Sequence, residues 1–74
     1  MAHRHDAETD IPHALLRKQV RDIASGTAGT LMAVRVENVA TAGGPGERWA
    51  EIAYIRPTRG GIEFTTAVSN IEPR

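Results

Sequence analysis

Residues 30–68 have the sequence TLMAVRVENVATAGGPGERWAEIAYIRPTRGGIEFTTAV. This stretch contains three runs rich in β-branched and aromatic residues, namely Thr30–Val39, Arg48–Ile55 and Ile62–Val68. All 7 glycines of the chain lie outside these runs, in segments 25–29, 43–46 and 58–61. Because glycine favours tight turns and weakens strand interiors, this distribution predicts a meander of antiparallel strands.

The alternation of side chains in Thr30–Val39 is irregular. A regular strand would place Met32, Val34 and Val36 on one face. Leu31 has the opposite parity, although it is as apolar as these residues. A β-bulge near Met32-Ala33 would account for the mismatch, so the sequence predicts one there.

The second run is apolar on both faces. One face would carry Trp49, Ala53 and Ile55, together with Glu51, and the other would carry Ala50, Ile52 and Tyr54. Either both faces are covered or one of them is a contact surface. The sequence leaves open which face belongs to the core.

The third run alternates regularly through Ile62, Phe64, Thr66 and Val68, which predicts a strand along its whole length. Residues 69–73, with the sequence SNIEP, are typical of a single helical turn. We expect Ile71 in this turn to close an open end of the sheet.

Residues 11–24 support two interpretations. Apolar residues recur at three- and four-residue spacings, which indicates a helix capped by Asp10 with Pro12 in its first turn. Alternatively, Pro12–Lys18 is a short helix or irregular lead-in, and Gln19–Ile23 is a first strand. We favour the second interpretation, because a barrel needs a strand before the turn at residues 25–29.

Residues 20–31 have the sequence VRDIASGTAGTL. They combine a V-x-D strand, a glycine-bearing turn and a spaced pattern formed by Gly26, Gly29, Leu31 and Val34. This opening resembles that of small Src-homology-3-like (SH3-like) barrels, including the ribosomal KOW type. Segments 53–57, 60–64 and 71–73 are similar to short barrel proteins of high-GC soil bacteria. The resemblance implies an SH3-like fold that binds peptides or nucleic acids, and it implies no catalytic residues.

We therefore predict an all-β fold, a small, partly open SH3-like barrel of about five antiparallel strands. A short helical or irregular segment would precede it. The 74 residues suffice for one domain, which we assign to residues 11–74 with a flexible polar tail at 1–10. The chain has no cysteine, no apolar signal segment and no run of about 20 apolar residues, so we expect a cytoplasmic protein without a membrane segment.

Arginine and aromatic residues gather on the predicted strands and the turn that follows them. The candidate binding residues are Arg35, Arg48, Trp49, Tyr54, Arg56 and Arg59. Arginine beside aromatic rings is typical of protein-contact and base-stacking surfaces. In the alternative interpretation, Glu37, Glu51 and Glu63 pair with these arginines across a solvated sheet face. A second basic group, Arg17, Lys18 and Arg21, fits either a phosphate contact or a solvated face.

The charged residues give no support to a tight nucleic-acid binder. The 9 basic side chains are balanced by 9 acidic ones, whereas nucleic-acid binders usually carry a basic surface. The leading hypothesis is a non-enzymatic interaction module that binds a protein partner or its own copy through a sheet face. A nucleic-acid-binding SH3/KOW-like barrel is the alternative.

We predict no enzyme, cofactor or metal site. The histidines, His3, His5 and His13, lie beside acidic residues but in or near the polar tail, where incidental histidines are the better explanation. The acidic residues of the predicted barrel are dispersed, and no histidine lies within it to activate a hydroxyl.

Overall fold

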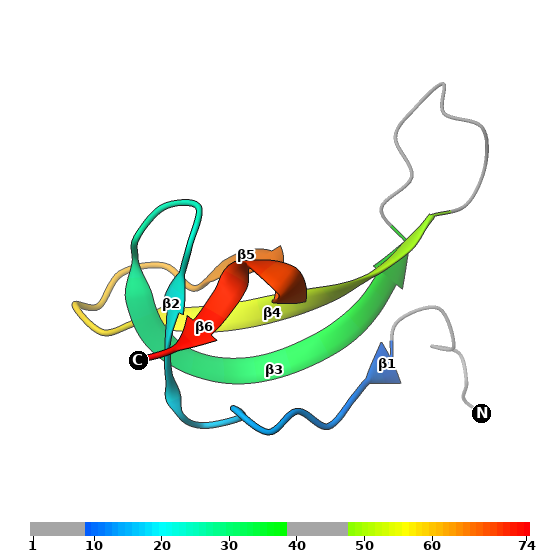
Figure 1. Ribbon diagram of the computed structural model, residues 1–74, viewed down its shortest axis with the longest axis horizontal. Helices are drawn as coiled ribbons and strands as arrows, with labels where there is room; N and C mark the ends of the chain where they lie inside the picture. The colour runs from blue at the N-terminus through cyan, green and yellow to red at the C-terminus, as the bar shows by residue number, and fades with distance from the viewer. Residues whose placement is uncertain (1–8, 39–47) are drawn as a thin grey trace.

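The computed structural model describes residues 9–38 and 48–74, which form a single antiparallel sheet (Figure 1). Its strands are β1 (Thr9–Asp10), β2 (Gln19–Asp22), β3 (Ala28–Asn38), β4 (Trp49–Pro57), β5 (Phe64–Ala67) and β6 (Ile71–Pro73). A 3-10 turn, η2 (Val68–Asn70), joins β5 to β6. The described residues contain no α-helix, and the predicted all-β fold is confirmed.

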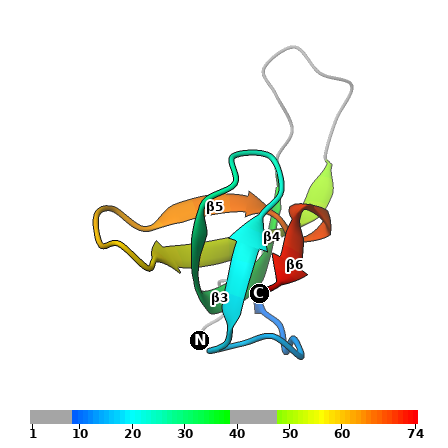
Figure 2. The ribbon, with the colours of Figure 1, turned by 60° about the vertical axis from the view of Figure 1, so that its left-hand side comes forward.

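Five strands follow one another across the sheet in the order β5-β4-β3-β2-β6. The short strand β1 pairs with Arg35 and Val36 of β3, beyond the part of β3 that pairs with β2. Figures 1 and 2 show that β3 is long and strongly curved, so that β2 and β6 come to lie across the inside of the β3–β4 hairpin. The sheet is therefore curled but open, with β5 and β6 at its two edges.

The segment before β2 is irregular. Residues 11–18 form turns without a helix, and Arg17 has a positive φ of 68°. The continuous-helix interpretation of residues 11–24 is therefore wrong, and the split into a lead-in and a strand is confirmed, with β2 at Gln19–Asp22. The lead-in follows β3 through backbone bonds from Ile11 N to Val34 O and from Arg17 N to Leu31 O, at 2.8 and 2.7 Å. Asp10 belongs to β1 and caps no helix.

The bulge predicted in β3 is confirmed. The pairing of β3 with β4 shifts between Leu31, opposite Ile55, and Ala33, opposite Tyr54. The extra residue brings Leu31 onto the same face as Val34, and both are buried. Met32, which we grouped with Val34, is displaced from that face and is only half-buried.

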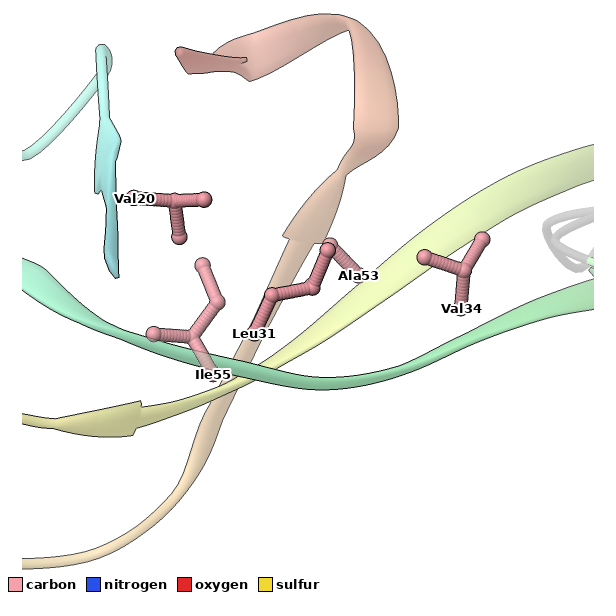
Figure 3. Close-up of a cluster of buried hydrophobic side chains, with 5 residues drawn as sticks. All are labelled: Val20, Leu31, Val34, Ala53 and Ile55. Carbon is pink, nitrogen blue, oxygen red and sulfur yellow. The ribbon is translucent and has the colours of Figure 1, made fainter. Parts of the chain in front are cut away.

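The core consists of five buried side chains from three strands: Val20, Leu31, Val34, Ala53 and Ile55 (Figure 3). Half-buried apolar residues surround it, including Leu15, Leu16, Phe64 and Ile71. Ala53 and Ile55 therefore decide the orientation of β4, whose core face is the one that also carries Trp49. Trp49 itself is 45% exposed, because the β3–β4 hairpin continues beyond the core.

The third predicted run is shorter than expected. Gly60 and Gly61 both have positive φ, 86° and 105°, so the turn extends to residue 63 and β5 begins only at Phe64. Ile62 is consequently 90% exposed and does not belong to the strand. At the other end, Val68 begins the 3-10 turn, and Ile71–Pro73 pairs with β2 instead of continuing a helical turn.

Gly29 corrects the prediction that every glycine lies outside the strands. It is a buried residue of β3, opposite Val20 of β2 and Pro57 of β4. A Cβ atom at this position would lie 2.3 Å from the carbonyl oxygen of Arg56 and 2.7 Å from Cγ2 of Ile55. Glycine is required here because the neighbouring backbone comes too close for any side chain.

We expect Gly29→Ala to destabilise the fold by about 1–3 kcal/mol, because β3 and β4 must separate to admit the methyl group. Urea unfolding followed by tryptophan fluorescence measures this loss. An unchanged unfolding midpoint would contradict the requirement for close approach.

Candidate binding surfaces

The outer face of the sheet, which points away from the core, carries Arg35 and Glu37 of β3 and Ile52 and Tyr54 of β4. The guanidinium carbon of Arg35 lies 5.9 Å from the centre of the Tyr54 ring, at the distance of a cation–π contact. The Tyr54 hydroxyl donates a hydrogen bond to the carboxylate of Glu37. The structure thus brings together two of the predicted site residues, Arg35 and Tyr54.

Of the two charged side chains on this outer face, Arg35 has an oppositely charged partner. Arg35 Nε lies 2.9 Å from Oδ1 of Asp10 in β1. Glu37, which the alternative interpretation paired with an arginine, instead accepts a hydrogen bond from Tyr54. The result is a surface formed by Ile52 and Tyr54 that also carries one arginine, opposite Ile52, and one carboxylate.

The other predicted residues lie elsewhere. Trp49 has the parity of the core face and is opposite Asn38, at the far end of the hairpin. Arg48 is exposed beside it, and its backbone N–H donates to Oδ1 of Asn38 at 3.4 Å. Arg56 is exposed near the opposite end of β4, and Arg59 lies in the turn that follows. The six predicted residues therefore do not form one site.

Arg59 lines a groove that the sequence did not predict. The groove has a volume of about 560 Å³ and lies between the turn after β2, the turn after β4 and the last residue, Arg74. Figure 1 shows both turns and the C-terminal end on the same side of the molecule. We call it the arginine groove, after Arg21, Arg59 and Arg74 in its lining. The only feature of the sequence that bears on this groove is the pair of glycine-bearing turns at residues 25–29 and 58–61. Neither turn sequence indicates that the two turns lie side by side.

Asp22 is the only charged side chain buried among residues 9–38 and 48–74, with 4% of its surface exposed. Its Oδ2 accepts hydrogen bonds from Ser25 Oγ at 2.6 Å and from Ser25 N at 3.1 Å. Its Oδ1 accepts one from Thr66 Oγ1 at 2.9 Å. The Ser25 hydroxyl is the main cause that lowers the pKa of Asp22 below its ordinary value, with help from Thr66 and backbone N–H groups and against the opposing effect of burial.

A depressed pKa in the folded state means that the Asp22 carboxylate stabilises the fold at neutral pH. This contribution is complete above the unfolded pKa of about 3.9 and is lost as the pH falls through the lower folded value. We expect Asp22→Asn to reduce the free energy of unfolding at pH 7 by about 1–3 kcal/mol. The difference from the wild type should shrink below about pH 4.

Urea unfolding of both proteins across this pH range measures the effect. Glu51→Gln is the matched control, because Glu51 is an exposed carboxylate on β4. A difference between Asp22→Asn and wild type that stays constant down to the lowest pH would show that the Asp22 charge does not matter.

The described residues contain no group of three histidine, cysteine or acidic side chains that could hold a metal ion. Nδ1 of His13 accepts a hydrogen bond from the backbone N–H of Leu15 at 3.0 Å, within the turn before β2. His3, His5, Asp6 and Glu8 lie outside the described residues.

No protein-family model matches the chain, and neither a curated protein nor a solved structure is significantly similar to it. Among residues 9–38 and 48–74, no helix is long and apolar enough to span a membrane. The fold and the two surfaces described above are therefore the basis for a functional proposal.

Proposed function

We propose that the chain is a non-enzymatic interaction module that binds a protein partner, or a second copy of itself, through the outer face of β3 and β4. The main support for this proposal is that Ile52 and Tyr54 lie on a face that no second layer of the described structure covers. A cytoplasmic location is part of the proposal.

The composition of the outer face supports this proposal. Tyrosine and arginine are enriched at the centres of protein interfaces, and here they contact each other beside an aliphatic residue. The contacts of Arg35 with Asp10 and Tyr54 hold its side chain in place, so less conformational entropy is lost when a partner binds.

The free edge of β5 gives a partner a second point of contact. β5 pairs with β4 on one side, and no described strand pairs with its other side. The 90% exposed Ile62 lies two residues before this edge. A partner segment that adds to β5 as a further strand would also cover Ile62.

We further propose that the fold is of the SH3-like type. Two features of the topology support it. The last strand, β6, pairs with β2, which begins the central meander, and a 3-10 turn immediately precedes β6. In the V-x-D strand, Val20 packs in the core and Asp22 accepts hydrogen bonds from Ser25 and Thr66. These two residues, on which the resemblance to SH3-like barrels rests, therefore have structural roles in this chain.

Ile52→Arg should abolish the interaction, because an extra arginine on the outer face would be buried without a partner. We expect at least a tenfold weaker association, about 1.4 kcal/mol. Affinity capture from a lysate identifies a partner, and sedimentation of the purified protein measures self-association.

Ser69→Arg is the matched control, because it adds the same charge at an exposed position in η2. Amide spectra confirm that both variants are folded. If folded Ile52→Arg keeps both the partner and the oligomeric state of the wild type, the outer face is not the binding surface.

A nucleic-acid-binding barrel is the second candidate, and the arginine groove is the observation that favours it. The neutral net charge of the chain argues against it. We expect no micromolar binding to single- or double-stranded oligonucleotides at physiological salt in fluorescence anisotropy. Tight binding with a steep salt dependence, lost in Arg56→Ala and Arg59→Ala, would reverse the order of the two candidates.

A further inference from the structure

The arginine groove concentrates positive charge in a chain whose net charge is zero. Arg21, Arg59 and Arg74 line it, and no acidic residue does. The remaining lining residues are small, apolar or carry hydroxyl groups, and the hydroxyl groups belong to Ser25, Thr27 and Thr58. None of Arg35, Glu37, Ile52 and Tyr54 lines the groove, so the inference does not depend on the function proposed above.

The three arginines differ in how they are held. Arg21 binds Glu72 through Nε, at 2.8 Å from Oε2, and through Nη2, so its Nη1 remains available on a side chain that is 48% exposed. Arg59 and Arg74 are exposed and have no ion-pair partner within residues 9–38 and 48–74. Because Glu72 compensates Arg21, the repulsion is chiefly between the guanidinium groups of Arg59 and Arg74, and a bound anion would relieve it.

The acidic groups closest to the groove are Glu72, which pairs with Arg21, and Asp22, which does not line the groove. Asp22 lies behind Ser25 and is 4% exposed. Both of its carboxylate oxygens accept hydrogen bonds, from Ser25 and from Thr66. Asp22 thereby fixes the turn that supplies Ser25, Gly26 and Thr27 to the groove wall.

We propose that the arginine groove binds a phosphate group of a small ligand. Guanidinium groups bind phosphate oxygens in a bidentate manner. The Thr27 hydroxyl can supply a further donor, whereas the Ser25 and Thr58 hydroxyls already donate to Asp22 and Gln19. The volume of about 560 Å³ falls within the range of small-molecule sites, and two turns bound the groove. The volume is sufficient for one phosphorylated small molecule.

The test is a titration of the full-length, ¹⁵N-labelled protein with pyrophosphate at constant ionic strength, followed by amide NMR. We expect saturable shifts at Gly26, Thr27 and Thr58, with a dissociation constant below about 1 mM. Arg59→Gln and Arg74→Gln should each weaken binding about tenfold. Arg48→Gln is the matched control, because it removes the same charge from an exposed position at the far end of β4, and it should leave the affinity unchanged.

Two results would overturn the proposal. One is an absence of saturation, or an equal loss of affinity in Arg48→Gln, which would show that pyrophosphate responds only to overall charge. The other is a single-stranded oligonucleotide that binds more tightly than pyrophosphate and is weakened by Arg48→Gln and Arg56→Gln. That result would show that Arg48 and Arg56 belong to a nucleic-acid-binding surface that extends beyond the groove.

Discussion

The hydrogen bonds of Asp22 hold two distant strands of the curled sheet together. β2 and β5 are separated by two strands in the sheet order, so no backbone pairing joins them. The bond from Thr66 of β5 to Asp22 of β2 therefore crosses the interior of the curled sheet. A carboxylate buried to this extent is tolerated because both oxygens accept hydrogen bonds. The same group orders the turn after β2, so it couples the closure of the fold to the shape of the arginine groove.

A sheet this small can curl only if its longest strand bends. β3 is irregular at the bulge after Leu31, and at Gly29 it approaches β4 closely. Together these two features bring β2 and β4 around a core of five buried side chains. Such a core cannot cover the whole β3–β4 hairpin, which explains why Trp49 is exposed despite having the parity of Ala53 and Ile55.

Local pattern was sufficient to predict β2, β3, β4 and the bulge, but it did not predict β1 or β6 as strands. The parity of Leu31 relative to Val34 is contained in the sequence, and so is the turn composition at residues 25–29 and 58–61. The sequence does not determine which face of β4 belongs to the core, because both faces are apolar. Only the packing of Ala53 and Ile55 in the folded structure decides between them. The prediction that Ile62 belongs to a strand was wrong. Its alternation with Phe64 suggested a strand, but Gly60 and Gly61 have positive φ values and extend the turn past Ile62. Of the predicted site, only the contact between Arg35 and Tyr54 followed from neighbouring strands.

The net charge of zero does not show how the charges are distributed over the surface. On the outer face, Asp10 compensates Arg35, while Glu37 keeps its negative charge and accepts a hydrogen bond from Tyr54. In the arginine groove, Glu72 pairs with one of three arginines and the other two remain uncompensated by described residues. The groove forms only when the turns after β2 and β4 meet Arg74 at one end of the sheet, which requires the fold to be complete. Two surfaces of opposite chemical character thus arise from one curled sheet, one on its outer face and one at its end.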